Sequence, residues 1–123
     1  MNKEKEENIK VFVRSTMRLG KFFNNYKIYF ANNEQKRKEG EAYYTKRISA
    51  VLREVEALTE EEKHFFYELM TKLADGYRQE EAKKLKTLQF GFAKICRENY
   101  MAIETVLEIK KKQKNKENLL ENV

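Results

Sequence analysis

The chain has 123 residues, with 41% hydrophobic and 37% charged residues, four glycines and no proline. That length is enough for one domain and too short for two, and a domain of this size buries enough surface to fold without a disulfide or a structural metal. Helix-breaking residues are few, so long helices are expected.

The formal net charge of +6 favours a polyanionic partner, such as nucleic acid or anionic lipid. A modest lysine excess on a solvated helical surface gives the same charge without any partner. The N-terminal stretch MNKEKEENIK lacks the apolar segment of a signal peptide, and no run approaches the roughly 18 apolar residues of a membrane span. We therefore expect a cytoplasmic protein with no membrane span.

The first predicted element is a helix from about residue 4 to residue 32. Apolar residues recur there in alternating steps of three and four, with Thr16 as the one polar member of the series. The stretch NNEQKRKEGE, residues 32–41, is polar and ends near Gly40. It predicts a linker or a frayed helix end.

Two shorter helices are predicted in the middle of the chain. Apolar residues follow helical spacing over residues 44–58, and Thr59 then stands three residues before Glu62. This spacing is a capping box, which predicts the start of the next helix. That helix has its apolar face at residues 65–73, and Gly76 is placed to end it as a left-handed C-cap.

The last predicted element is one continuous helix from about residue 77 to residue 112. A turn at residues 86–88 would break the register that the apolar residues keep over residues 85–109. The members of this series expected at an oligomer seam are Leu88, Phe92, Ile95, Asn99 and Val106. The asparagine can fix register or partner number, or it can be hydrogen-bonded inside an intramolecular bundle.

These elements predict an all-α fold of three to four helices, either a bundle or an elongated helical hairpin with long first and last helices. Residues 1–109 form the single helical domain. Residues 110–123 lose the apolar series and are rich in lysine, so we expect a frayed C-terminal tail.

Residues able to support catalysis are few. His64 is the only histidine and stands beside two phenylalanines, which fits a helix surface better than a general base. Cys96 is the only cysteine and lies close to the apolar series, which fits a small buried hydrophobe better than a nucleophile. Glutamates at residues 60–62 fit a helix N-terminus, and no glycine-rich phosphate loop is present. We expect a protein that is not an enzyme, with no cofactor, metal site or small-molecule substrate.

Two basic helix faces give the strongest functional signal. At about 100° per residue, each set of cations lies on a face away from the apolar residues of its helix, and an aromatic ring lies among the second set. The predicted nucleic-acid-binding residues are Lys10, Arg14, Arg18, Lys21, Lys83, Lys86, Phe90, Lys94 and Arg97. Cations around an exposed ring suit a sugar-phosphate backbone or an unstacked base, and they equally suit an acidic groove of a protein partner. A solvated face with the ring packed under a loop is the alternative without any partner.

The segment from residue 58 has a pattern of residues made of Leu58, Thr59, Glu62, Gly76, Glu81, Ala82 and Leu85. In these residues it resembles the C-terminal helix-turn-helix of sigma-factor region 4 and of LuxR-type regulators. The later stretch FGFAKICRENYMAIETVLEI is similar to the last helix of phage late-transcription regulators of the ArpU and RinA type. The resemblance covers residues 58–109 and implies DNA binding and a regulatory role in a phage or mobile element. Glu81, Lys86 and Thr87 depart from its pattern.

We therefore expect a small non-enzymatic protein of regulatory or accessory function that binds nucleic acid or a nucleoprotein. The alternative is a protein-interaction module, such as an inhibitor, an immunity protein or an anti-defence protein, acting through its helical surface. A homodimer is compatible with both, because long apolar series often need a second copy.

Overall fold

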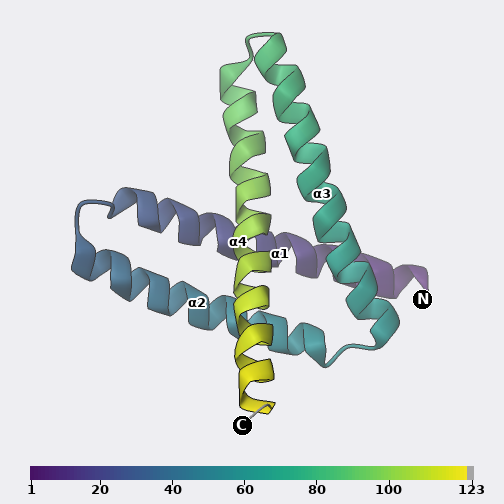
Figure 1. Cartoon of the computed structure of the whole chain (residues 1–123). Coiled ribbons are helices and arrows are strands. Elements are labelled where there is room, and N and C mark those ends of the chain that lie inside the picture. The colour runs from purple at the N-terminus through teal and green to yellow at the C-terminus, as the bar shows by residue number, and fades with distance from the viewer. Residues whose placement is uncertain (122–123) are drawn as a thin grey trace.

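The computed structural model describes residues 1–121, which form four α-helices and no strand. The helices are α1 (Lys3–Tyr29), α2 (Glu34–Glu56), α3 (Glu60–Lys86) and α4 (Phe90–Glu121). The all-α class, with long first and last helices, is confirmed. Figure 1 shows α1 and α2 returning on each other as one hairpin, and α3 and α4 forming a second hairpin that crosses the first.

The first three helices start at side chains that accept a backbone N–H left unpaired by the first turn. Asn2 accepts from the amide of Lys5 at 2.9 Å, and Asn33 accepts from the amide of Lys36 at 3.1 Å. The capping box predicted at Thr59 is present, because the Thr59 and Glu62 side chains each accept the other residue's backbone N–H.

The hydrophobic core lies where the two hairpins cross. Its largest fully buried side chains are Val13, Thr16, Ile48, Leu52, Val55, Phe66, Met70, Ile103 and Val106. Thr16 is the one polar residue of the first predicted apolar series. Its hydroxyl has a hydrogen-bond partner within α1, because it donates to the carbonyl oxygen of Phe12 at 2.7 Å. All four helices contribute to this core, so neither hairpin buries its apolar face alone.

The linker predicted at residues 32–41 is wrong, because α2 begins at Glu34. The polar residues there pair along the helix surface, as in the ion pair of Lys38 with Glu34 at 3.2 Å. Gly40 is buried against the ring of Tyr26, so it marks a close approach of α1 and α2. A solvated helix face and a linker share this composition, which is why the prediction failed.

The helix end predicted at Gly76 and the continuous helix predicted over residues 77–112 are also wrong. α3 passes through Gly76, which has a negative φ, and continues to Lys86. The chain turns at residues 87–89, although the helical spacing of apolar residues over residues 85–109 predicts a continuous helix there. The inner helices are therefore longer than expected, and the α3–α4 corner lies about three turns later than predicted.

The C-terminal ends of the first and last helices also differ from those predicted. α1 ends at Tyr29, a few residues before the predicted end, and α4 continues beyond residue 109 to Glu121. The tail expected at residues 110–123 is thus helical as far as Glu121, and residues 122–123 lie outside the described residues. No helix within residues 1–121 combines the length and the apolar character needed to cross a membrane.

Candidate functional site

The tip of the α3–α4 hairpin concentrates positive charge and exposed apolar side chains. Residues 82–97 contain five lysines and arginines and no carboxylate. The exposed large apolar residues of this stretch are Leu85, Leu88, Phe90, Phe92 and Ile95. Figure 1 shows the tip projecting away from the point where the hairpins cross, so partners can approach it from several sides.

The turn at the tip is a Schellman motif with leucine at the left-handed position. The amide of Gln89 donates to the carbonyl of Lys84 at 2.8 Å, and the amide of Leu88 donates to that of Leu85 at 3.2 Å. Leu88 has a φ of 58°, and it is the one non-glycine residue with a positive φ among the described residues. Glycine or asparagine usually takes this position, which explains why the sequence hid the turn.

The five predicted binding residues near the tip are divided between the two helices. Lys83 and Lys86 lie on α3, whereas Phe90, Lys94 and Arg97 lie on α4, and we call these five residues the cationic tip surface. Phe90 is 61% exposed, which excludes its packing under a loop. The three lysines are exposed and form no ion pair within residues 1–121.

Arg97 differs from those lysines because it already has a carboxylate partner. Its Nε donates to Glu81 Oε2 at 2.6 Å, and this hydrogen bond is the main reason that the pKa of the Arg97 guanidinium is raised. The other oxygen of Glu81 accepts the hydroxyl of Tyr100 at 3.1 Å. Arg97 therefore joins α3 to α4 and has less capacity for an external anion than the lysines have.

The four predicted residues on α1 form a second, less uniform basic face. Lys10 pairs with Glu7 at 3.3 Å, while Arg14 and Arg18 are exposed without an ion pair in the described structure. Lys21 donates to Asn99 Oδ1 at 3.3 Å, which is where the α1 face meets α4. The two predicted basic faces therefore touch only at their edges.

Only the C-terminal part of the predicted oligomer seam contacts α1. Val106 is fully buried inside the chain, and Asn99 is half-buried with Lys21 as its donor, so these two residues serve the intramolecular core. Leu88, Phe92 and Ile95 are 71%, 61% and 50% exposed, and we call these three residues the exposed stripe. For Asn99 and Val106, the structure therefore shows contacts within the chain, which was the alternative to an oligomer seam.

A second apolar series on α4 packs against α3, one residue out of phase with the predicted seam. Its members are Ala93, Cys96, Tyr100, Ile103 and Leu107, again in steps of three and four. Tyr100 fixes the direction of this series, because its hydroxyl reaches Glu81 on α3. The sequence contained this second series, which indicates that α4 packs on two sides, although the series does not identify the neighbouring helix.

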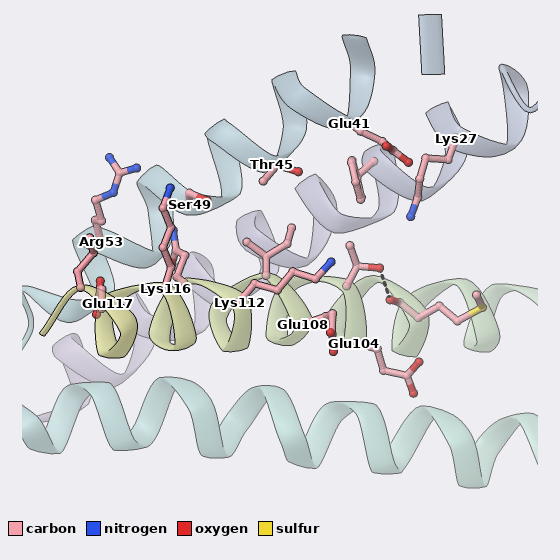
Figure 2. Close-up of a pocket in the computed structure, with 16 residues that line it drawn as sticks. Lys27, Glu41, Thr45, Ser49, Arg53, Glu104, Glu108, Lys112, Lys116 and Glu117 are labelled. Carbon is pink, nitrogen blue, oxygen red and sulfur yellow. Dashed lines mark hydrogen bonds between the residues drawn. The ribbon is translucent and has the colours of Figure 1, made fainter. Parts of the chain in front are cut away.

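A separate open groove of about 810 Å³ lies between α2 and the C-terminal half of α4, with Phe23 and Ile109 in its lining (Figure 2). Its charged lining residues are Lys27, Glu41, Arg53, Glu104, Glu108, Lys112, Lys116 and Glu117. Figure 2 shows Lys116 projecting from α4 toward α2. Four carboxylates balance four cations, so the groove offers no net charge to a polyanion.

The remaining titratable groups have local structural explanations. His64 lies on the surface of α3 with its Nε2 3.2 Å from Glu68, and Cys96 is buried, as the sequence predicts for both. Burial raises the pKa of Tyr67 to about 12, and its hydroxyl has no hydrogen-bond partner within the described structure. The ammonium group of Lys110 lies 3.4 Å from the centre of that ring, and burial lowers the pKa of Lys110.

No protein-family model matches the chain, and no curated protein or solved structure is significantly similar to it. The turn at residues 87–89 coincides with the turn of the resembled helix-turn-helix, but α3 runs unbroken through residues 76–85 and lies alongside α4 (Figure 1). The resemblance to a helix-turn-helix therefore stays a prediction.

Proposed function

We propose that the protein is a non-enzymatic regulatory or accessory protein that binds nucleic acid, or a nucleoprotein, through the cationic tip surface. The observation that carries this proposal is the exposure of Lys83, Lys86 and Lys94 without ion pairs in the described structure, at the same end of the hairpin as the exposed ring of Phe90. Side chains without a carboxylate partner lose nothing internal when they approach a phosphate.

The chemistry of binding follows from two features of the tip. Lysines would neutralise phosphates and release condensed counterions, which makes affinity fall with salt concentration. Phe90 stands at the first residue of α4, and the first turn of that helix carries no acidic residue. A ring in this place can stack on an unpaired base, while nearby backbone amides favour an anion.

Charge reversal at two tip lysines tests the proposal. The double variant Lys86→Glu/Lys94→Glu should bind a fluorescein-labelled 20-nucleotide DNA of random sequence at least about tenfold more weakly at low salt. Its plot of log affinity against log salt should be shallower by about two units, because each lysine contributes about one phosphate contact. Fluorescence anisotropy with single-stranded and duplex DNA at several salt concentrations measures both quantities.

The matched control is Lys3→Glu/Lys46→Glu, which changes net charge equally at exposed positions distant from the tip in sequence. This control should keep most of the affinity, because a local contact depends on position more strongly than on total charge. Equal losses in the two double variants, or no measurable binding by the unmodified protein at low salt, would overturn the proposal.

The second candidate function is a protein-interaction module, and the exposed stripe specifically favours it. Leu88, Phe92 and Ile95 have no charge and offer little to a phosphate backbone. Exposed contiguous apolar residues with a cationic rim are typical of surfaces that meet another protein.

A further inference from the structure

Phe92 and Ile95 of the exposed stripe continue a face of α4 that already packs against a helix. Ala102 and Val106 lie on this face, and a methyl group at Gly20 of α1 would overlap the carbonyl oxygen of Ala102. About two and three turns from Ala102 toward the tip, the same face carries Ile95 and Phe92, whose side chains are exposed. The uncovered part of the face therefore has the shape that already accommodates a helix lower down α4.

Leu88 adds an independent reason to look for a partner outside the chain. A left-handed backbone costs an L-residue about 1–2 kcal/mol relative to a right-handed one. The side chain of Leu88 is 71% exposed, so burial within the chain does not offset this cost. Contact with another molecule would supply the missing burial.

The charges around the exposed stripe indicate the chemistry of its partner. The ammonium group of Lys84 lies 5.8 Å from the ring centre of Phe92, and Lys21 sits on Asn99 at the other end. Lys84 already pairs with Glu80 at 3.5 Å, and Glu98 lies about one turn from Ile95, but five cations outnumber three carboxylates over residues 80–98. A second copy of the chain would bring the same positive tip, so acidic side chains are favoured in the occupant.

We propose that the exposed stripe is a docking site for an acidic amphipathic helix of another protein. Phe92 and Ile95 lie about one turn apart on α4, or roughly 5 Å along its axis, which matches apolar anchors at positions i and i+3 or i+4 of the incoming helix. Leu88, in the turn before α4, adds a third exposed apolar side chain toward the tip. Carboxylates flanking those anchors pair with Lys21 and share Lys84 with Glu80. The docked helix continues on α4 the contact that α1 makes at Ala102.

This site is separate from the cationic tip surface, so the inference goes beyond the proposed function. Phe92 lies about 160° round α4 from Phe90, and Ile95 lies about 100° from Lys94. Nucleic acid on one side of the hairpin and a protein helix on the other need no shared side chain.

The test uses a synthetic 18-residue helical peptide with leucine at the anchor positions and glutamate elsewhere, labelled with fluorescein. The peptide should bind the full chain, and Phe92→Ser/Ile95→Ser should weaken this binding by about tenfold or more, because buried apolar anchors carry most of the energy of such interfaces. A peptide with lysine in place of every glutamate should bind at least about tenfold more weakly. Fluorescence anisotropy measures all these affinities.

Two controls separate this result from unfolding and from nucleic-acid binding. Val11→Ser/Phe22→Ser removes apolar residues of similar exposure from α1 and should leave peptide binding unchanged. Phe92→Ser/Ile95→Ser should keep both the melting temperature and the DNA affinity of the unmodified chain, because its side chains are exposed and lie away from Phe90. Loss of DNA binding in Lys86→Glu/Lys94→Glu therefore reports on the proposed function alone.

Four results would overturn the docking proposal. They are no binding of the acidic peptide, equal binding of the lysine peptide, equal binding by Phe92→Ser/Ile95→Ser, and a dimer in sedimentation that this double variant abolishes. Capture of vesicles of phosphatidylcholine and phosphatidylserine that depends on Phe92 and Ile95, without peptide binding, would assign the stripe to a lipid surface instead.

Discussion

Leu88 combines a left-handed backbone with an exposed apolar side chain, and neither feature stabilises the fold. The Schellman hydrogen bonds at the end of α3 require the backbone conformation, and glycine adopts it without steric cost. The leucine side chain instead points to an intermolecular use. Stability and binding are therefore expected to respond in opposite directions to substitution at this residue.

Leu88→Gly should raise the free energy of unfolding by about 1 kcal/mol, since relief of the left-handed strain exceeds the extra chain entropy of glycine. Leu88→Ala is the control, because it removes the side chain and keeps the strain, so its stability should stay close to that of the unmodified chain. Urea unfolding followed by circular dichroism measures both. A glycine variant less stable than the alanine variant would contradict this account of Leu88. Both variants should bind the acidic peptide more weakly than the unmodified chain does.

At the residue scale the sequence predicted features whose chemistry is local. The capping box of Thr59 and Glu62 is present because three-residue spacing alone brings those groups together. The turn at Leu88 was missed because the usual signal, glycine at the left-handed position, is absent, while Gly76 offered that signal inside a helix. Leu73 and Tyr77, before and after Gly76 in the chain, pack against the core, and this packing of α3 overrides the weak helix propensity of glycine.

At the scale of helices, the contact between α1 and α4 depends on the absence of one side chain. Gly20 is buried where the backbone of α1 meets Ala102 and the side chain of Val106. A rigid carbonyl cannot rotate away as a side chain would, so any Cβ at this position must push the two helices apart.

Gly20→Ala should therefore lower the free energy of unfolding by about 1–3 kcal/mol through overpacking. Gly76→Ala is the matched control, because a Cβ at that position has open space around it. It should raise stability by up to about 1 kcal/mol, the difference in helix propensity between alanine and glycine. Urea denaturation compares the two; a Gly20→Ala protein as stable as Gly76→Ala would contradict the close contact of α1 with α4.

Element boundaries and neighbours were harder to predict than helical character, for a physical reason. α4 packs on α1 through one apolar series and on α3 through another, and both have steps of three and four. The first series was read as an oligomer seam because periodicity identifies apolar faces without naming their partners. Only the crossing of the hairpins shows that Val106 belongs to the intramolecular core and Phe92 does not.

At the scale of the whole molecule, buried residues are concentrated where the hairpins cross, and the two surfaces that we propose to bind partners lie at the projecting tip. No residue is buried over residues 75–92, whereas residues 102–109 include four buried apolar side chains, Ala102, Ile103, Val106 and Ile109. The tip is held by surface pairs between α3 and α4, such as Arg97 with Glu81 and Arg78 with Glu104. Exposed pairs of this kind contribute little each, so the tip should open without unfolding the body.

Hydrogen exchange followed by mass spectrometry should therefore show amides of residues 80–92 exchanging by local opening, well before those of residues 48–55 and 102–109, which exchange only on global unfolding. Arg97→Gln should speed exchange at the tip and leave the body unchanged, because it removes the charge that joins α4 to Glu81. Uniform protection along α3 and α4 would contradict the division into a stable body and a weakly held tip. Saturation with the acidic peptide should slow amide exchange around Phe92. The docked helix would bury apolar side chains at the tip and so stabilise its closed state.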